Sequence, residues 1–393
     1  MISLALLLIP AAGQEDNWAS FGTESGLLSS DVYSVAASED GVWAGLNGAV
    51  ARFVSENSTW SNLNPPELTT RVKCIDIGEG EVWFGTFGDG VYLRESGSWS
   101  NYRKEDGLPD SRIEDLVIQD GKVFVATGGG ASRITPGSPP SFKNVRETDG
   151  LPEESLTSVG VAGGVVWFGT KANGVLGLDL DDFSFRTQVT IEDGLSDSRI
   201  VSLAGDGEAL WIGTGAGGLC RFHTGNGSVE VFNRSTGLVD NLVGCVAVGN
   251  RVWAGSWGAG VSALSPGGIV NTYLEEDGLI GNDIRDISTV SDSVWFATSK
   301  GLSRFEDRAV GPGGGGIPIV YGVVGVIIVV AIIVPLALRS GTGKPAEKRE
   351  RKRRPYEICG GQPREDLCPF CKYNVVKGGR NYCSKYNLNI DFE

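Results

Sequence analysis

The hydrophobic pattern of this chain repeats along most of its length. In each repeat an aromatic residue lies within a short apolar stretch, followed two positions later by Gly or Ala and then mostly by Thr or Ser. These aromatic residues are Trp43, Trp83, Phe124, Trp167, Trp211, Trp253 and Trp295. They lie 40, 41, 43, 44, 42 and 42 positions apart. Short apolar stretches with such a regular spacing predict β-strands in a repeat architecture.

A second hydrophobic mark recurs in phase with the first. It is a Leu, usually preceded by Gly, at Leu27, Leu68, Leu108, Leu151, Leu195, Leu238 and Leu279. Four or five residues later an aliphatic residue opens another strand, at Val32, Val72, Ile113, Leu156, Ile200, Val243 and Ile284. Each unit therefore holds four short strands, which is the content of one propeller blade. The sequence predicts an all-β, seven-bladed β-propeller over residues 14–310. A β-solenoid repeat is usually shorter, and a sandwich would not repeat its own sequence.

The two ends of the repeat region are out of step by one strand. An outer-strand segment from Trp18 to Phe21 precedes the first unit, whereas the last unit ends at Phe305 without one. We therefore expect the N-terminal strand to complete the last blade, which would leave no unpaired sheet edge at the seam.

The chain ends predict an orientation in a membrane. Residues 1–13 have the apolar stretch and small-residue exit of a signal peptide, and residues 317–338 form an uncharged run long enough for one transmembrane helix. A Gly-rich spacer, 311–316, precedes that run, and a basic juxtamembrane segment, 339–358, follows it. The positive-inside rule then places the C-terminus in the cytoplasm and the propeller outside a cell membrane. The basic cluster serves either this topology alone or contact with anionic membrane lipids.

The balance of basic and acidic residues differs between the two sides of the predicted membrane. Residues 339–393 hold 13 basic and 7 acidic side chains, which leaves 21 basic and 41 acidic ones in the rest of the chain. So acidic an outer region is not expected to bind nucleic acid. The chain contains 58 Gly but one His, His223, so histidine-based catalysis finds little support.

Four cysteines lie close together in the predicted cytoplasmic tail, 359–393. They are Cys359, Cys368, Cys371 and Cys383. In a reducing compartment such a cluster favours metal binding over disulfides, and four thiolates suit zinc. An iron–sulfur or redox role and simple free thiols are the alternatives. Cys74, Cys220 and Cys245 instead fall in propeller strands and are expected to be buried, unbridged thiols.

The repeats resemble the two-component regulator propeller repeat, which is marked by Gly-Leu, an Ile a few residues on, and a Trp-x-Gly-Thr strand. The resemblance covers residues 17–306 and carries the motifs Trp-Phe-Gly-Thr at Trp83 and Trp167 and Trp-Ile-Gly-Thr at Trp211. It implies an extracellular or periplasmic sensor whose blades precede a membrane span and a signalling module. Only 55 residues follow the predicted span here, into which no kinase domain fits. A cytoplasmic signalling partner is among the expected partners.

The loops that join second to third strands are the predicted binding face, because loops on a rigid scaffold concentrate binding residues. The residue after the Thr position varies among blades, and this variation favours a specialised contact cluster. The predicted ligand contacts are Trp257, Phe87 and Lys171, helped by Asp89 and Asn173. The alternative is that the two aromatic residues only plug the mouth of the central channel.

Other polar residues have simpler interpretations. Recurrent aspartates in the Gly-Leu turns are expected to cap their own backbone rather than bind calcium, at Asp106, Asp149, Asp193 and Asp277. The group Asp179, Asp181 and Asp182 is expected to form a turn between third and fourth strands. Glycosylation sequons begin at Asn57, Asn226 and Asn233.

These observations predict a single-pass, receptor-like protein. Its propeller would bind an extracellular small molecule, glycan or protein, and no organic cofactor is expected. A membrane-tethered lyase or hydrolase that uses carboxylates is one alternative, and a cell-surface adhesion or scaffold protein is another. An enzyme would show paired carboxylates on the loop face with a raised pKa, whereas adhesion would require a broad apolar patch.

Overall fold

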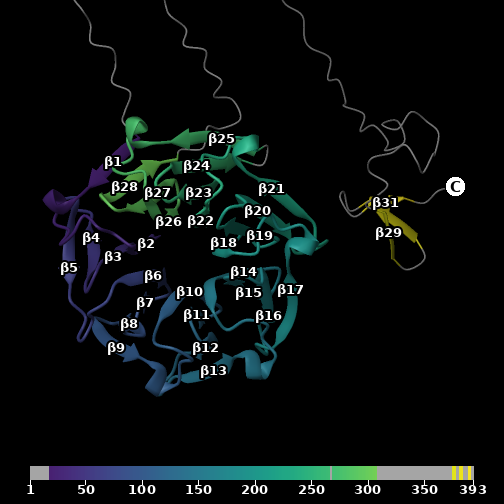
Figure 1. The fold of residues 1–393 in the computed structure, drawn as a ribbon, viewed down its shortest axis with the longest axis horizontal. Coiled ribbons are helices and arrows are strands. Elements are labelled where there is room, and N and C mark those ends of the chain that lie inside the picture. The colour runs from purple at the N-terminus through teal and green to yellow at the C-terminus, as the bar shows by residue number, and fades with distance from the viewer. Residues whose placement is uncertain (1–16, 266–267, 308–373, 378–379, 384–387, 391–393) are drawn as a thin grey trace, which may run out of the picture. The chain divides into compact units, whose positions relative to one another are not determined.

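The computed structural model describes residues 17–265, 268–307, 374–377, 380–383 and 388–390. Within these residues the chain forms two units, one N-terminal and one C-terminal, with the boundary at Gly314. The N-terminal unit consists of seven antiparallel four-stranded sheets arranged around a central axis, which confirms the seven-bladed propeller (Figure 1).

The sheets follow the repeat along the chain, so that blade 1 holds β2–β5 and blade 7 holds β26–β28 with β1. The first strands lie nearest the axis (Figure 1): β2 (Ser34–Ser38), β6 (Val72–Ile77), β10 (Ile113–Gln119), β14 (Leu156–Ala162), β18 (Ile200–Gly205), β22 (Cys245–Val248) and β26 (Ile284–Val290). The second strands are β3 (Gly41–Gly45), β7 (Glu81–Thr86), β11 (Lys122–Thr127), β15 (Val165–Thr170), β19 (Ala209–Thr214), β23 (Val252–Ser256) and β27 (Ser293–Thr298).

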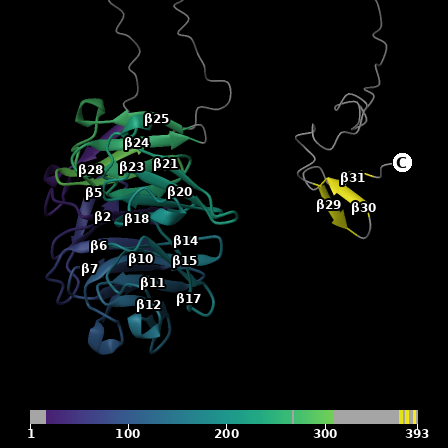
Figure 2. The same ribbon diagram turned by 45° about the vertical axis from the view of Figure 1, so that its right-hand side comes forward.

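The remaining strands complete each blade outward. The third strands are β4 (Val50–Val54), β8 (Val91–Glu95), β12 (Gly130–Thr135), β16 (Val175–Asp179), β20 (Leu219–His223), β24 (Gly260–Ser265) and β28 (Gly301–Glu306). The fourth strands are β5 (Thr59–Leu63), β9 (Ser98–Tyr102), β13 (Ser141–Val145), β17 (Phe185–Val189), β21 (Val229–Phe232), β25 (Gly268–Tyr273) and β1 (Trp18–Phe21). Figure 2 shows the blades at an oblique angle, each sheet twisted relative to its neighbours.

The ring closes as the sequence predicts. β1 pairs antiparallel with β28, with Trp18 opposite Phe305 and Phe21 opposite Leu302. This pairing joins the two ends of the propeller by main-chain hydrogen bonds, so the last blade gains its fourth strand from the start of the chain.

Hydrophobic clusters lie between adjacent blades rather than within them. Trp43 of blade 1 packs in a cluster with Phe84 and Tyr92 of blade 2, and Trp295 of blade 7 packs with Val35 and other residues of blade 1. A single blade cannot bury its own aromatic residue, so each repeat needs its neighbours to form a core.

At these interfaces the Gly of the Trp-x-Gly strand packs against the aliphatic residue that opens the next blade. A Cβ added to Gly169 of blade 4 would lie 2.6 Å from Cγ2 of Ile200, the residue that opens blade 5. Gly85 and Gly255 stand in the same relation to Ile113 and Ile284. The Gly of the Trp-x-Gly strand therefore recurs because the opening residue of the next blade packs directly on its Cα.

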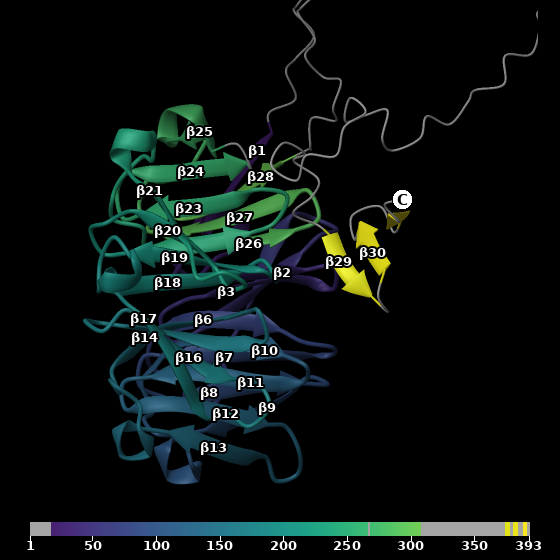
Figure 3. The ribbon, with the colours of Figure 1, turned by 90° about the vertical axis from the view of Figure 1, so that its right-hand side faces the viewer.

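Six short 3-10 turns in the described residues lie at Gly-Leu links and gather on one face of the ring, at the left in Figure 3. They are η1 (Thr23–Ser25), η2 (Lys104–Asp106), η3 (Glu147–Asp149), η4 (Ile191–Asp193), η5 (Arg234–Thr236) and η6 (Glu275–Asp277). The predicted capping aspartates do cap these turns: Asp106 accepts from Arg103 N, and Asp149, Asp193 and Asp277 do the same in their own turns. The group from Asp179 to Asp182 forms the expected turn between β16 and β17.

The C-terminal unit contains a small antiparallel sheet of β29 (Asn374–Lys377), β30 (Arg380–Cys383) and β31 (Leu388–Ile390), in that order. The predicted signal peptide, spacer, transmembrane helix and basic segment lie outside the described residues, as do Cys359, Cys368 and Cys371. The described residues contain no helix that is long and apolar enough to cross a membrane.

Candidate functional site

A cavity of about 1190 Å³ runs along the centre of the ring. Its walls are the first strands of all seven blades, together with Lys171 and Trp257 from loops between second and third strands. A cavity of this size accommodates a small organic ligand, and its lining mixes charged and apolar groups.

β-Bulges determine which side chains face the mouth of this cavity. In five blades the residue after the opening aliphatic residue has no partner on the second strand, and the ladder shifts by one position. The bulged residues are Lys73, Glu114, Thr157, Val201 and Arg285, and all five line the cavity. Such a bulge redirects one side chain out of the regular alternation of a strand.

In three blades the next residue of the first strand accepts a hydrogen bond from a backbone N–H of the following blade. Asp115 accepts a hydrogen bond from Val159 N of blade 4, and Asp286 accepts one from Val35 N of blade 1, both at 2.9 Å. In blade 5 the hydroxyl of Ser202 has the same role for Val246 N. These residues therefore connect neighbouring blades beneath the mouth.

The identity of this fastening residue is coupled to the residue opposite it. Asp115 and Asp286 are paired with Ala126 and Ala297, whereas the smaller Ser and Cys residues are paired with Gly. The Ser and Cys pairs are Ser34–Gly45, Cys74–Gly85, Ser158–Gly169, Ser202–Gly213 and Cys245–Gly255. Close packing between blades explains why these positions vary so little in size.

Burial perturbs the ionisable groups of this ring. It raises the pKa of Asp115 and of Asp286 to about 7, although each carboxylate accepts backbone N–H groups that act in the opposite direction. Burial also raises the pKa of the Cys74 and Cys245 thiols well above the usual value. Buried thiols with raised pKa values are inert, and the expectation that Cys74, Cys220 and Cys245 are buried and unbridged is confirmed.

One side of the mouth is a network of mutually neutralising charges. Arg285 contacts Asp31 at 2.6 Å and Asp283 at 3.3 Å, and its guanidinium lies 4.7 Å from the ring centre of Tyr33. The Tyr33 hydroxyl donates to Asp31, which raises the pKa of Tyr33. These contacts neutralise the charge of Arg285 where blades 7 and 1 meet.

A second cluster of charged groups, in which two cations share one carboxylate, lies in blades 2 and 3. Glu114 pairs with both Lys73 and Arg112, the latter at 2.9 Å. The Arg71 guanidinium lies 4.1 Å from the ring centre of Phe87 and 5.7 Å from that of Tyr33, so two aromatic faces compensate its charge in part.

Blades 4, 5 and 6 present a different surface. Trp257 is 48% exposed and lies over Gly244, since a Cβ at that position would come within 2.6 Å of its Cδ1. Arg199 lies over Gly215 in the same manner, with Cδ 2.8 Å from a Cβ placed there. Lys171 is exposed and lines the cavity with these two residues.

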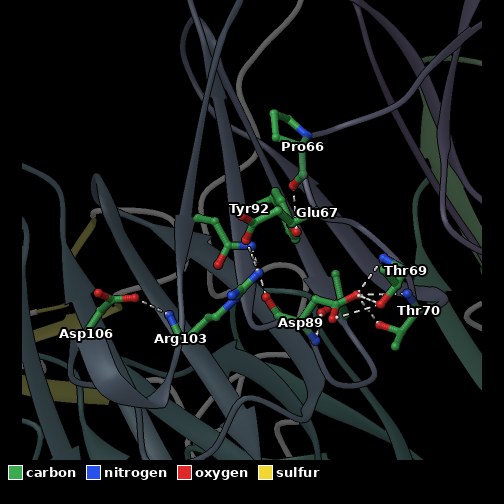
Figure 4. A network of polar contacts seen from close by, with 10 residues as sticks. Pro66, Glu67, Thr69, Thr70, Asp89, Tyr92, Arg103 and Asp106 are labelled. Carbon is green, nitrogen blue, oxygen red and sulfur yellow. Dashed lines mark hydrogen bonds and ion pairs between the residues drawn. The ribbon is translucent and has the colours of Figure 1, made fainter.

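Two of the five predicted ligand contacts, Trp257 and Lys171, line the cavity, and three do not. Phe87 lies under Arg71. Asp89 turns its carboxylate toward Thr69 and Thr70, where it accepts from both backbone N–H groups at 2.8 Å and from both hydroxyls (Figure 4). Partial burial raises the pKa of Asp89, but these donors together outweigh it and place the pKa below the usual value.

Asn173 is engaged in a comparable loop contact. Its Nδ2 donates to Glu153 at 3.0 Å, and its backbone N–H donates to the Thr170 hydroxyl. Figure 4 also shows that Arg103 and Tyr92 hold the preceding loop through Glu67 and the Pro66 carbonyl. In the described structure, the side chains of Asp89 and Asn173 hold loops in place.

The sequence pattern did not single out the polar residues that flank the opening aliphatic residue of several first strands. The cavity-lining residues of this kind are Tyr33, Arg71, Lys73, Glu114, Arg199, Asp283 and Arg285. The aligned repeats could have indicated these residues, because a varying and often charged residue lies on each side of the opening aliphatic residue. Only the bulges show that both flanking positions face the mouth.

Comparison with known proteins identifies the fold. No family model matches the chain, and no curated protein matches it in sequence. The extracellular domain of BT3049 from B. thetaiotaomicron, assigned to the hybrid two-component systems, superposes with a TM-score of 0.60 at 17% identity, over 74% of this chain and 42% of that one. The extracellular domain of BT4673 from the same organism gives 0.61 at 18% identity, over 73% and 39%.

The fold is shared with these two extracellular domains. This chain spans about two fifths of the length of those two structures. A catalytically inactive variant of virginiamycin B lyase from Staphylococcus aureus also superposes, with a TM-score of 0.60 at 18% identity over 74% of this chain and 98% of that one. At these identities the likeness shows the propeller fold alone.

The remaining candidate residues lie away from the cavity. His223 ends β20 and lies 3.4 Å from Glu230 on the neighbouring strand, a partner that the sequence did not reveal. Asn57 and Asn226 are exposed in turns, whereas Asn233 is half-buried and caps η5. In the described parts of the chain no cluster of three or more His, Cys, Asp or Glu residues is arranged to hold a metal ion.

Proposed function

We propose that the propeller is the extracellular ligand-binding domain of a single-pass, receptor-type membrane protein. The observation that carries this proposal is the cavity mouth at blades 4 to 6, where Trp257, Lys171 and Arg199 stand exposed on a rigid ring. Exposed aromatic and charged side chains around a preformed concavity are typical of ligand sites. The membrane orientation comes from the apolar run at 317–338 and the basic residues after it.

The fold likeness to extracellular domains of two-component-like systems agrees with this proposal, as does the resemblance of the repeats to the two-component regulator propeller family. Under this proposal a cytoplasmic partner would receive the signal.

The carboxylates of raised pKa do not favour the enzyme alternative. Asp115 and Asp286 lie below the loop face, and each already accepts hydrogen bonds from backbone N–H groups. The described propeller residues also do not favour adhesion, which would require a broad apolar patch. The large exposed hydrophobic residues in the described propeller are single residues at Leu28, Phe87, Ile191 and Trp257.

The experiment is a thermal-shift screen of the full chain in detergent against neutral and acidic saccharides, short peptides and small organic acids. A ligand at about 100 times its Kd would stabilise the folded state by about 2.7 kcal/mol. Trp257→Ala is expected to abolish the shift while leaving the Tm of the free protein in place. Ile191→Ala is the matched control, because Ile191 is 59% exposed but does not line the cavity.

Two results would contradict the proposal. One is a panel in which no compound shifts the Tm. The other is a ligand whose shift is the same in wild type and in Trp257→Ala, which would place binding elsewhere.

We also propose that Cys359, Cys368, Cys371 and Cys383 bind one zinc ion, on the basis of their spacing and predicted cytoplasmic location. Metal analysis of the purified full chain should give one zinc per chain, lost in Cys371→Ser and retained in Cys245→Ala, whose thiol is buried in the propeller. A metal-free wild-type chain would refute this assignment.

A further inference from the structure

The mouth of the cavity is divided into two unequal parts. Blades 7, 1, 2 and 3 carry charged groups that are compensated by one another or by aromatic rings. Blades 4, 5 and 6 carry two cations and an indole. This difference points to the chemistry of the ligand, and it rests on the proposed ligand-binding function.

The cations of blades 4 and 5 are uncompensated among the described residues. Lys171 and Arg199 form no ion pair and no side-chain hydrogen bond there, and both are exposed. In contrast, Lys73, Arg112 and Arg285 are half-buried and paired with carboxylates. The open cations are therefore the ones available to a molecule arriving from solvent.

Two carboxylates, those of Asp197 and Glu153, accept hydrogen bonds from loop N–H groups. Asp197 accepts from Arg199 N at 3.0 Å and from Ala216 N at 2.9 Å. Glu153 accepts from Ala172 N and from the Asn173 side chain. These loops thus hold their acidic groups in place without pairing them with the Lys171 and Arg199 side chains.

The backbone also brings the two cations toward each other across the blade boundary. Gly174 N, in the loop that carries Lys171, donates to Ser198 O, the residue before Arg199, at 3.0 Å. Trp257 follows on blade 6, where its indole lies over Gly244, a residue of the same cavity wall. Neighbouring blades thus supply two cations and an aromatic face to one segment of the mouth.

We propose that this segment, Lys171, Arg199 and Trp257, binds an anionic ring compound. The ligand's carboxylate, sulfate or phosphate group would lie between Lys171 and Arg199, and its ring would stack on Trp257. Arg and Lys together form charge-assisted hydrogen bonds with such oxyanions, and an indole face supports a saccharide or aromatic ring. The two cations, which form no ion pair among the described residues, are free to pair with an incoming oxyanion.

The floor of the cavity favours this placement. Asp76, Asp115 and Asp286 line it below the mouth. When they are ionised they repel an anion from the deeper channel, so the acidic group of a ligand is favoured at the mouth.

The test uses a matched pair of probes, benzenesulfonate and benzyl alcohol, which share a ring and differ in charge. Saturation-transfer NMR on the full chain in detergent would measure binding of each at up to about 10 mM, the range expected for ligands of this size. Benzenesulfonate is expected to bind and to be displaced by inorganic sulfate. Benzyl alcohol is expected to bind about tenfold more weakly or not at all.

Variants distinguish binding at this segment from an effect of the protein's overall charge. K171M/R199M should weaken benzenesulfonate binding about tenfold or more, and Trp257→Ala should weaken it about fivefold. R52M/R186M removes two exposed cations from outer strands and should leave the affinity within about twofold. Gly215→Ala keeps the charge but displaces Arg199, and it should cause a loss of a few fold.

Several outcomes would overturn the inference. They are absence of benzenesulfonate binding, equal binding of benzyl alcohol, and equal losses in K171M/R199M and R52M/R186M. If a neutral compound from the screen binds in a Trp257-dependent manner while benzenesulfonate does not, the proposed function stands and the anion assignment falls.

Discussion

The interior of the propeller and the mouth of its cavity use the same strands under opposite constraints. Trp253 and Trp257 lie four residues apart in the chain, yet Trp253 is 0% exposed between blades 6 and 7 while Trp257 is 48% exposed at the mouth. The interior residue has aromatic neighbours in Tyr273, Phe296 and Phe305. The mouth residue lies over Gly244 and its backbone bridges to Asp283 of blade 7.

This difference shows where the repeat is constrained and where it is free to vary. At the first-strand positions of Asp115, Asp286 and their counterparts, Asp is paired with Ala and Ser or Cys is paired with Gly, because the space between blades is fixed. One residue away, at the bulge, the side chain is Lys, Glu, Thr, Val or Arg in different blades. Packing therefore restricts the residue type at one position of the strand and leaves the adjacent position free to vary.

The largest expected contrast is between the two tryptophans. Trp253→Ala should lower the free energy of unfolding by about 3–5 kcal/mol, because it empties a core site between blades. Trp257→Ala should change it by less than about 0.5 kcal/mol, because its indole is half exposed. Guanidinium unfolding of the full chain measures both. Equal losses would show that Trp257 is a structural plug, the alternative left open by the sequence.

The buried carboxylates of Asp115 and Asp286 should make the free energy of unfolding depend on pH. Asp115 and Asp286 have pKa values of about 7 in the folded chain and near the usual 3.8 when unfolded, so the folded chain binds more protons between these values. Raising the pH from about 5 to about 7.5 should therefore lower the free energy of unfolding by a few kcal/mol, with a flatter dependence above that range.

The residue at the equivalent position of blade 5, Ser202, suggests a control variant for this pH dependence. Ser202 fastens blade 6 with a hydroxyl where Asp115 and Asp286 use carboxylates. The double variant D115S/D286S should retain the N–H acceptor and lose most of the slope, as measured by unfolding midpoints between about pH 5 and pH 8. An unchanged slope in the variant would assign the dependence to other groups.

The loop bonds of Asp89 should contribute an intermediate effect. Asp89→Ala removes the acceptor for Thr69 and Thr70 and should lower the free energy of unfolding by about 1–2 kcal/mol, with faster amide exchange at both threonines. Unchanged exchange at these amides, together with lost ligand binding, would instead restore the ligand-contact role predicted from the sequence.

The smallest expected effect comes from removing the Glu114 carboxylate, which would leave cations without an ion pair in blades 2 and 3 as in blades 4 and 5. Glu114→Gln releases Lys73 and Arg112 from their shared carboxylate and should change the free energy of unfolding by less than about 1 kcal/mol. It should also tighten benzenesulfonate binding about two- to threefold through the added local charge. A loss of affinity would show that Glu114 itself contacts the probe.

Much of the fold was predictable because its signals are local. The period between aromatic residues gave the number of blades, and the unmatched segment at Trp18 to Phe21 gave the closing strand. The capping role of Asp106 and its counterparts was predictable as well, since each bonds a backbone N–H three residues away. The site was predicted only in part: Trp257 and Lys171 line the cavity, whereas Arg199 and the paired charges at Asp31 and Arg285 were missed.

The sequence by itself determined the blade count, the order of strands and the closure of the ring, because strand pairing within a repeat and packing between consecutive repeats follow the chain. Only the tertiary structure decided which charges remain free. Asp31 and Arg285 are separated by most of the propeller in sequence, yet they pair at 2.6 Å once the ring closes. Lys171 and Arg199 are left without such a partner among the described residues, and Glu153 and Asp197 accept hydrogen bonds from the backbone N–H groups of Ala172 and Ala216.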